Sequence, residues 1–527
     1  MKIIKGGLKT SFSLIPNRPL FYCGAALIFS PGLLFTMKFY LIPNHVFACF
    51  GLFLLSLGLV FVLTTDLKAE VYFVDDSASA SDSNSGTVSA QPLRTINAAL
   101  QKTQPGDVVV VRPGDYRNED SGFGEGVIPV LKSGTDGNEI QILGAGNAIV
   151  HSFLIQNCEY VRVSGFQFTN SQFEEFEGWQ DMPVIVRDVP VDPENPIDFT
   201  ADYSQRANVI EAMFSTYFDV ISELEFVSGI DVFNAEHITI VNTRIDGYWA
   251  GIQCRGCRDI TIAENRISHC VNGVFGWEPA PGLRDSLIRD NRITYSFDTG
   301  IFIRRQSDNV VIRDNFVAYS GINHISLQEG ATNCIIANND VRRGGYYSET
   351  MRFPGSSAIN VHSSGEGNLV TDNWASYQID LTGIDGNGMI LDLMEGDSVQ
   401  VSRNFLLRNM GSGLNLTISP NAIINDNRFV QNGFQSDVPG NGSAVKLSRT
   451  QDIDNVIVRN MFINNREGGI ISNLTIGQQL NVNFNSYHLA NGQPLFLDGA
   501  GANQLSLETL EEAQLFTGWE LFGESNR

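Results

Sequence analysis

Lysine is nearly absent from most of this 527-residue chain. Between residues 133 and 527 the only lysine is Lys446, in "GNGSAVKLSRT", whereas the same stretch contains 23 arginines. An arginine side chain stays protonated under ordinary conditions, but a lysine ammonium titrates readily when it is buried. Lys446 is therefore either a candidate for acid–base chemistry or an ordinary solvated side chain.

Positive charge is scarce in the chain as a whole, which carries a formal net charge of -23. Residues 1–69 hold six basic residues against one aspartate, a balance of +5 that leaves -28 for residues 70–527. A body this acidic disfavours nucleic acid and anionic membrane surfaces as partners.

Cysteine is also scarce, because two of the seven cysteines lie in the first 69 residues. The remaining five are Cys158, Cys254, Cys257, Cys270 and Cys334. An odd number at irregular spacing argues against a disulfide framework, and "CRGC" without a second ligand pair is weak evidence for zinc. We expect these cysteines to be small apolar core residues.

Long apolar runs occur only near the N-terminus, at residues 19–35 and 46–63. Reading from Met37, a basic start, an apolar stretch and the small residue Ala69 are typical of a secretion signal. The alternative is a two-helix membrane anchor. Either interpretation predicts a leader over residues 1–69 and a body over residues 70–527 that is secreted, periplasmic or on the cell surface.

Helical periodicity is absent from the body, and a repeat replaces it. Segments such as "GIQCRGCRDITIAENRI" and "GIFIRRQSDNVVIRDNFV" share a glycine, an alternating strand, a turn and an asparagine, mostly with periods of 23 to 26 residues. Three short strands per repeat predict an all-β fold, a single-stranded right-handed parallel β-helix with a helical cap at 93–103. The asparagines are expected to form a structural ladder at a tight turn; they are Asn242, Asn265, Asn291, Asn315, Asn339, Asn373, Asn404, Asn427, Asn460 and Asn485.

Insertions interrupt the repeat at one corner. From the asparagine to the next repeat the count is usually 9 or 10 residues, but it is 20 before Ile359, 16 before Met389 and 18 before Val445. Loops inserted at one corner of a solenoid gather on one face and usually form a binding wall. We therefore expect such a wall from residues 343–357, 377–387 and 431–443, and the insertion at 171–207 leaves the same corner.

The strands beside this wall alternate, so that every second residue points away from the core. With rungs ~4.8 Å apart, His362 and Asp392 should be direct neighbours. Arg304 should lie two rungs before His362, and Lys446 two rungs beyond Asp392. The other outward residues that could bind substrate are Asn360, Asn415, Gln328, Trp277, Phe302 and Arg255. The simpler interpretation is that outward residues of any solenoid are polar by default.

The segment "VDDSASASDSNSGTVSAQPLRTINAALQKTQPGDVVVVRPGDYRNE" resembles the entry segment of extracellular β-helix proteins of the pectate-lyase-like superfamily, which carry PbH1 repeats. The closing "SLETLEEAQLFTGWELFGES" is similar to their tail, so the resemblance covers residues 71–527. It implies the fold but not the substrate, because that superfamily includes lyases, hydrolases, epimerases and proteins that are not enzymes.

The nearest chemical resemblance is to polysaccharide lyase family 9, in which Lys446 falls on the position of the catalytic base. Gly411, Ser412 and Asn415 stand where that family has calcium-binding carboxylates, so the calcium motif is not retained. Calcium stays a candidate cofactor without a clear ligand set. "GIFIRRQSDNVVIRDNFVAYSGINHISLQEG" also resembles the chondroitinase B and alginate lyase group, but Arg305 and Gln328 replace the expected lysine and arginine.

These features predict an exported, monomeric, polysaccharide-active protein, with a lyase that acts by β-elimination on an acidic, uronate-containing glycan as the leading hypothesis. Lys446 would be the base, Arg304 would pair with the substrate carboxylate, and His362, oriented by Asp392, would donate the proton. A glycoside hydrolase is an alternative that needs a second carboxyl beside Asp392, from Asp380 or Asp385. The other alternative is a glycan-binding or envelope protein without catalysis.

Overall fold

A computed structural model describes residues 22–29, 33–40, 69–170, 227–277, 281–345, 355–380, 385–394, 399–433, 442–449, 452–472, 480–490, 492–498, 505–517 and 519–525. The chain forms two compact units, Met1–Lys68 and Ala69–Arg527. In the first unit β1 (Tyr22–Phe29) and β2 (Leu33–Tyr40) pair antiparallel. No helix in the described parts of the chain is long and apolar enough to cross a membrane. The apolar run at 46–63 and the insertion at 171–207 lie outside the described residues.

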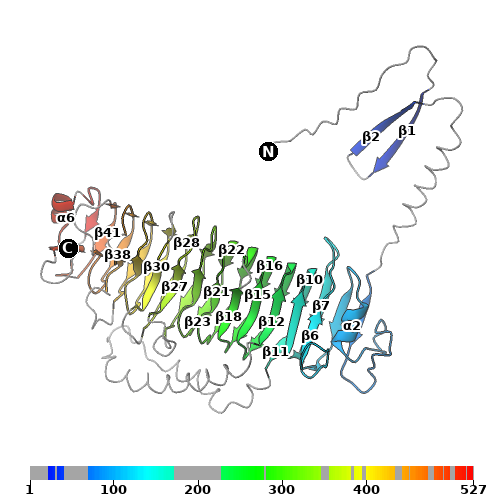
Figure 1. Cartoon of the computed structure of the whole chain (residues 1–527). Helices are drawn as coiled ribbons and strands as arrows, with labels where there is room; N and C mark the ends of the chain where they lie inside the picture. Colours follow the sequence, from blue (N-terminus) through cyan, green and yellow to red (C-terminus); the bar gives the residue numbers. More distant parts are fainter. Residues whose placement is uncertain are drawn as a thin grey trace. The chain divides into compact units, whose positions relative to one another are not determined.

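The second unit is built from three sheets of 14 strands each (Figure 1). Sheet 1 contains β3 (Val71–Val74), β4 (Val108–Val111), β7 (Ile140–Gly144), β10 (Glu159–Ser164), β13 (Glu236–Val241), β16 (Arg258–Ala263), β19 (Arg284–Arg289), β22 (Asp308–Arg313), β25 (Ile335–Ala337), β28 (Leu369–Thr371), β31 (Gln400–Ser402), β34 (Ile423–Asn425), β37 (Val456–Val458) and β40 (Asn481–Asn483). Every neighbouring pair in this sheet is parallel, so each rung of the coil adds one strand.

Sheet 2 follows sheet 1 along the chain in every rung. It contains β5 (Gly114–Asp115), β8 (Ala148–Val150), β11 (Gln167–Thr169), β14 (Arg244–Asp246), β17 (Arg266–Ser268), β20 (Arg292–Thr294), β23 (Phe316–Ala318), β26 (Asp340–Arg342), β29 (Trp374–Ser376), β32 (Phe405–Leu407), β35 (Arg428–Val430), β38 (Met461–Ile463), β41 (Ser486–His488) and β44 (Glu524–Ser525). Its strands are short because a tight turn precedes each of them and the variable corner follows.

Sheet 3 lies beyond that corner. It contains β6 (Val127–Val130), β9 (Ser152–Gln156), β12 (Ser228–Phe233), β15 (Ala250–Arg255), β18 (Asn272–Trp277), β21 (Ile301–Ile303), β24 (Ile325–Gln328), β27 (Ser357–His362), β30 (Asn387–Asp392), β33 (Leu414–Thr417), β36 (Val445–Leu447), β39 (Ile470–Ser472), β42 (Phe496–Asp498) and β43 (Leu505–Leu507). Only its last pair, β42 with β43, is antiparallel among the described pairings of the three sheets. The three stacked sheets confirm the predicted β-helix.

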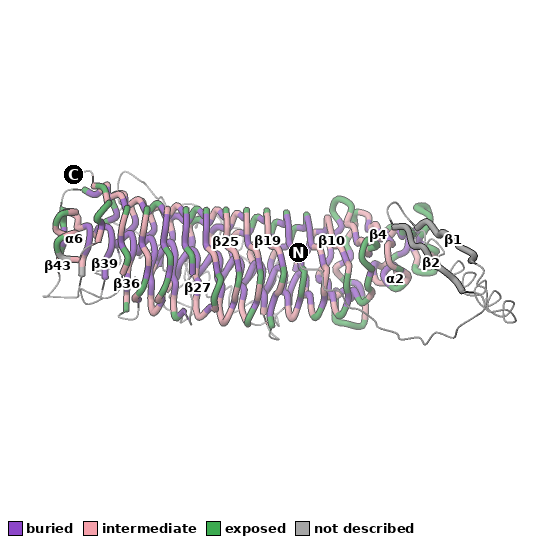
Figure 2. Tube along the Cα trace, turned by 90° about the horizontal axis from the view of Figure 1, so that it is seen from above, coloured by how far each residue is buried: buried purple, intermediate pink, exposed green. Residues whose placement is uncertain are grey.

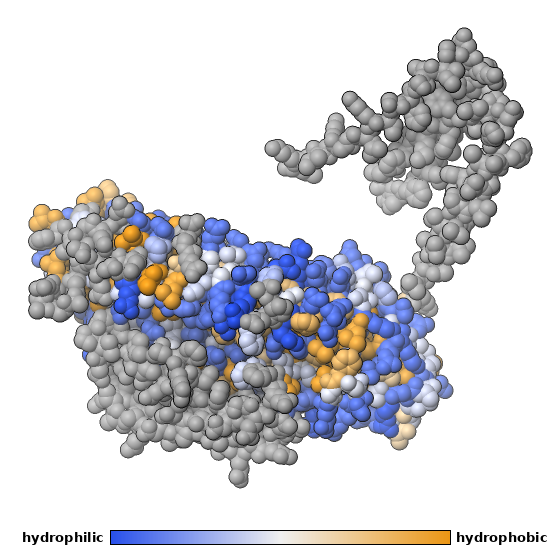
Figure 3. Space-filling model, viewed as in Figure 1, coloured by the Kyte–Doolittle hydropathy of each residue, from blue (hydrophilic) through white to orange (hydrophobic). Residues whose placement is uncertain are grey.

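One continuous apolar core fills the coil, since inward side chains of successive rungs lie on top of one another. Ile230, Ile252 and Val274 are such a column, and each is fully buried. Buried and exposed positions alternate along the coil in Figure 2, and on the face shown in Figure 3 hydrophilic residues predominate between smaller apolar areas. All five cysteines of the body are free and buried, which confirms their prediction as core residues.

Short helices lie near both ends of the described coil. Helix α2 (Ile96–Lys102) lies within the range predicted for the cap, and the Thr95 hydroxyl caps it by accepting a bond from the Ala98 N–H. Its buried residues Ile96, Ala99 and Leu100 belong to the main core. Helix α6 (Leu510–Thr517) follows the antiparallel strand β43.

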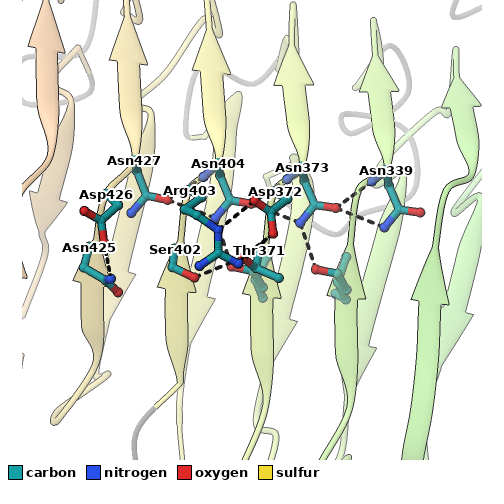
Figure 4. A network of polar contacts seen from close by, with 12 residues as sticks. Asn339, Thr371, Asp372, Asn373, Ser402, Arg403, Asn404, Asn425, Asp426 and Asn427 are labelled. Atoms are coloured by element: carbon teal, nitrogen blue, oxygen red, sulfur yellow. Dashed lines mark hydrogen bonds and ion pairs between the residues drawn. The ribbon is translucent and has the colours of Figure 1, made fainter.

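The predicted asparagine ladder joins sheets 1 and 2 (Figure 4). Each side chain donates to the next one and to a backbone carbonyl: Asn373 Nδ2 lies 3.0 Å from Asn404 Oδ1 and 2.9 Å from the Ile336 carbonyl oxygen. The Asn373 Oδ1 also accepts the backbone N–H of Asn339, so donors and acceptor are all used. This pattern runs without a break from Asn265 to Asn485.

The first predicted ladder member is wrong by one residue. Thr243 occupies the position, and its N–H and hydroxyl both donate to Asn265 Oδ1. Asn242 is exposed in left-handed backbone, the conformation that Glu264 adopts one rung later. The sequence "NTRI" in place of "ENRI" moves the asparagine from the ladder position to the turn position.

Candidate functional site

The outward face of sheet 3 has the register that the repeat spacing predicts. Asn360 pairs with Ile390 and His362 with Asp392 in adjacent strands. Two rungs further, Lys446 of β36 pairs with Asn415 of β33. The middle parts of the expected wall, residues 346–354, 381–384 and 434–441, lie outside the described residues, so the site is built from the strands and the ends of these loops.

His362 and Asp392 contact each other on adjacent rungs. His362 Nδ1 lies 2.9 Å from Asp392 Oδ2, and the two side chains are 32% and 26% exposed. A carboxylate that holds the Nδ1–H of a histidine fixes the orientation of the ring and leaves Nε2 for another partner. The pair is therefore both ordered and accessible to a ligand.

Asp385 lies at the other edge of the same sheet, two residues before β30 begins. Its pKa is raised to about 7, first by burial and then by the charge of Asp380. The Lys446 ammonium and the Asn387 amide, 3.2 Å away, oppose this rise, and the charge of Asp392 adds to it. A carboxyl group with this pKa is partly protonated at neutral pH, as a general acid must be.

The carboxyl group of Asp380 holds the backbone of Asp385 in place. The Asp380 side chain is fully buried, and its Oδ2 accepts the backbone N–H of Asp385 at 2.7 Å. A buried carboxylate cannot contact a large substrate, but its charge and its hydrogen bond act on the residue above it. Asp380 is therefore a positioning group in this site.

Lys446 is half-buried on β36, and its pKa is lowered, mainly by burial. The carboxylates of Asp385 and Glu467 partly restore it, whereas Arg449 lowers it further. Lys446 therefore interacts electrostatically with the carboxyl group whose pKa is raised, and each of the two groups affects the ionisation of the other.

Arg304 has a different surrounding from the one its predicted role requires. Its guanidinium contacts the carboxylate of Glu329, and Arg305 Nε lies 2.9 Å from the other oxygen of the same residue. Glu329 therefore offsets one of the two positive charges, and the three side chains together keep a net charge of +1. The repeat pattern gave no indication of this, because Glu329 follows β24 in left-handed backbone, outside the alternating positions.

The remaining predicted binding residues line the same outward face. Asn415 is buried and its Oδ1 accepts a bond from the Ser448 hydroxyl at 2.6 Å, whereas Asn360 is half-exposed. Gln328 donates to the Ser326 hydroxyl at 3.0 Å. Arg255 pairs with Asp231, and Trp277 and Phe302 belong to an aromatic cluster several rungs before His362.

The described residues do not offer a set of metal ligands. No group of three or more histidine, cysteine, aspartate or glutamate side chains converges on a common point in the described residues. Asp380 and Asp385 are close, but the first is buried and the second carries a proton near neutrality, which suits calcium poorly. The expected calcium ion thus finds no fitting ligand set in the described residues.

The sequence predicted Asp380 and Asp385 only as possible second carboxyl groups of a glycoside hydrolase. Both residues flank the inserted loop before Met389, which is the signal that could have identified them. Glu329, Glu467 and Asp298 were missed. The pKa of Asp298 is raised to about 6, chiefly by burial, on the strand edge that Asp385 occupies further along.

Comparisons with known proteins agree with this architecture. A family model described as right handed beta helix region matches residues 228–389. No curated protein matches the sequence. Among solved structures, the alginate lyase from Paenibacillus sp. str. FPU-7 is similar at 15% identity and a TM-score of 0.40, over 63% of this chain and 91% of that one.

Two further structures illustrate how varied these likenesses are. The GH136 lacto-N-biosidase from Eubacterium ramulus is 14% identical with a TM-score of 0.42, over 75% of this chain and 68% of that one. The pectate lyase Pel9A is 13% identical with a TM-score of 0.30, over 82% and 79% of the two chains. The family model agrees with the β-helix fold, and no activity of this chain follows from structures of such low identity and TM-score.

Proposed function

We propose that this protein is a glycoside hydrolase that uses Asp385 as general acid and Asp392 as the second carboxyl group. The observation that carries the proposal is the pair of carboxyl groups that flank β30, Asp385 with its raised pKa and Asp392 in contact with His362. Two carboxyl groups in different environments are what acid and base roles require. Asp385 would protonate the glycosidic oxygen as the C1–O bond breaks, and Asp392 would take a proton from the attacking water.

The placement of the two residues favours inversion of configuration. β30 (Asn387–Asp392) is roughly 16 Å long, with Asp385 before it and Asp392 at its end, so the two carboxyl groups lie at opposite edges of sheet 3 and too far apart for the direct nucleophilic attack of a retaining enzyme. Among the charges that shift the pKa of Asp385, Asp392 has the smallest effect, as expected for the most distant of them. Inverting enzymes leave ~6.5–9.5 Å between their carboxyl groups to admit the water.

The charge of the site favours a neutral glycan. Asp380, Asp385, Asp392 and Glu467 face Lys446 and Arg449, while Glu329 engages both Arg304 and Arg305. A polyuronate needs an uncompensated cation for each carboxylate that it brings into the site. The charge distribution therefore favours a neutral glycan over the acidic glycan that the sequence suggested.

A lyase remains the second candidate because of one observation, the lowered pKa of Lys446. The neutral amine could abstract the C5 proton of a uronate while Asp385 protonates the leaving oxygen. Lys446 is also the residue on which the resemblance to polysaccharide lyase family 9 places the base.

A polysaccharide panel separates the two reactions. We expect new reducing ends from neutral glycans without ultraviolet-absorbing unsaturated products. Unsaturated products from uronates would establish the lyase instead, and binding without turnover of any glycan would establish a non-catalytic protein.

Export through the leader is part of the proposal. The boundary between the two compact units falls between Lys68 and Ala69, and the first strand of the coil begins at Val71. Cleavage near Ala69 would therefore leave the coil intact. Mass spectrometry of the mature protein tests this, because an uncleaved chain that sediments with membranes would indicate an anchor.

A further inference from the structure

An aromatic cluster lies on the outward face of sheet 3, apart from the main core. Phe275 and Phe302 are buried there against Ala250, and the half-buried Trp249 and Trp277 pack on them. The ring of Phe275 lies 5.0 Å from Trp277 and 5.5 Å from Phe302. The residues that alternate with these phenylalanines, such as Val274 and Ile301, face inward and belong to the core.

An outward aromatic cluster has no role in closing the coil. Trp249 and Trp277 are only half-buried, so part of this cluster lies at the surface, where gathered apolar groups usually mark a binding site. The indole N–H of Trp277 is buried and has no hydrogen-bond partner among the described residues. Because an indole nitrogen only donates, the group that satisfies it must be an acceptor such as a hydroxyl or ring oxygen.

The arginines beside the cluster form ion pairs with carboxylates. Arg304 lies 5.0 Å above the ring of Phe302 and is paired with Glu329. On the other side Arg255 lies 4.9 Å above Phe233 and is paired with Asp231. Such ion pairs beside aromatic rings suit a ligand rich in hydroxyl groups, since they offer both hydrogen-bond donors and acceptors.

The cluster is continuous with the candidate site. Trp277, Arg304, Gln328 and His362 occupy the same outward column on four successive rungs. Three rung spacings place Trp277 roughly 14 Å from His362 along the coil. A glycan chain that lies along the coil axis would span this distance with a few sugar units.

We propose that Trp277, supported by Phe275 and Phe302, forms a remote sugar-binding subsite for the distal part of a neutral glycan chain whose bond is cleaved between Asp385 and Asp392. This inference rests on the proposed glycan-cleaving function. It predicts a preference for long chains, because short oligosaccharides cannot occupy both places.

The test compares Trp277→Ala with Trp374→Ala, which removes an exposed tryptophan from the outward face of sheet 2. The probes are xylo- and chito-oligosaccharides of graded length, with oligogalacturonates as the acidic series. Trp277→Ala should raise KM for the long neutral chains about three- to tenfold, the range of a lost aromatic contact, without changing kcat or the values for disaccharides. Trp374→Ala should change neither, and Trp277→Tyr should restore most of the affinity.

Binding to the Asp385→Asn variant, measured by calorimetry, separates this inference from the hydrolase proposal. Chain-length-dependent binding that Trp277→Ala removes supports the subsite even if no turnover is found. The proposal is overturned if Trp277→Ala leaves long-chain affinity unchanged, weakens short and long chains equally, or if no neutral series binds with a dependence on length.

Discussion

The asparagine ladder and the outward face of sheet 3 differ in the polar groups that they bury and in how these groups are paired. The ladder asparagines before Asn485 repeat the same three bonds from rung to rung, and none of these bonds involves a charged group. On sheet 3 the residues differ at every rung, and Asp385 and Lys446 are ionisable groups with displaced pKa values. The difference indicates that the asparagine ladder stabilises the fold. The outward face of sheet 3 instead buries ionisable groups at a cost in stability, as functional sites do.

The length of the turns follows the same division. The ladder turn has a left-handed residue, such as Asp372 or Arg403, directly before each asparagine, and it does not vary in length. The corner before sheet 3 accepts insertions of different lengths, and Asp380 and Asp385 flank one of them. Predictions about the two regions can therefore be tested separately, since activity and stability should respond to different substitutions.

The largest effect is expected for Asp385→Asn. An amide cannot donate a carboxylic proton, so kcat should fall about 10³-fold, within the range for loss of a general acid. The wild-type Asp385 has a folded pKa of about 7, above its ordinary value of 3.8, so its contribution to the free energy of unfolding falls as pH rises from about 4 to 7. Thermal unfolding should show the variant to be at least as stable as the wild type at neutral pH, and a destabilised variant would contradict this.

In the other region Asn373→Ala should reduce stability without a direct effect on the site. It leaves the Asn339 N–H and the Asn404 Oδ1 without their side-chain partner inside the coil. We expect a loss of about 2 to 4 kcal/mol in the free energy of unfolding, measured by denaturant titration. Asn481→Ala, at an exposed strand position, is the matched control and should change stability by less than about 0.5 kcal/mol.

His362→Ala should lower kcat by roughly 10- to 100-fold, because Asp392 loses the partner that orients it. The chain offers a matched control in His237, which pairs with Asp259 away from sheet 3. His237→Ala should leave activity unchanged. Equal losses in both variants would show that the assay reports stability and not catalysis.

Lys446→Met distinguishes the two candidate reactions. In a hydrolase kcat should change by less than about tenfold, and the alkaline limb of the pH profile should move to higher pH, because the ammonium holds down the pKa of Asp385. In a lyase both Lys446→Met and Lys446→Arg should abolish activity. Pre-steady-state and steady-state rates across the pH range provide the measurement.

The smallest effect is expected for Asp380→Asn. The amide oxygen can still accept the Asp385 N–H, but the negative charge that raises the pKa of Asp385 is lost. The pH at which activity declines should therefore move downward by up to about one unit, with kcat at lower pH preserved. A loss of activity at every pH would assign Asp380 a direct role.

The fold and the register of the site were predictable because a repeat places chemically equivalent residues at a fixed distance. His362 and Asp392 were located from spacing alone, and the structure confirms that they are neighbours. The same spacing argument failed for Asn242, because Asn242 and the neighbouring Thr243 both fit the repeat. Thr243 is the residue that occupies the ladder position.

The environment of the site was not predictable in the same way. The pairing of Arg304 with Glu329 depends on a left-handed turn residue that the alternation does not cover. The pKa of Asp385 depends on how an inserted loop returns to the sheet, bringing Asp380 beneath it. A second ladder, formed by Gln378, Asn409, Asn432 and Asn465 beside the variable corner, was hidden by the insertions that follow these residues.

Product analysis on neutral glycans tests the central claim most directly. Proton nuclear magnetic resonance of the first products should show new reducing ends of inverted configuration, no unsaturated sugar, and about 10³-fold slower product formation with Asp385→Asn. Unsaturated products released from a polyuronate by the Asp385→Asn variant, but not by Lys446→Met, would contradict the hydrolase proposal and assign the catalytic role to Lys446.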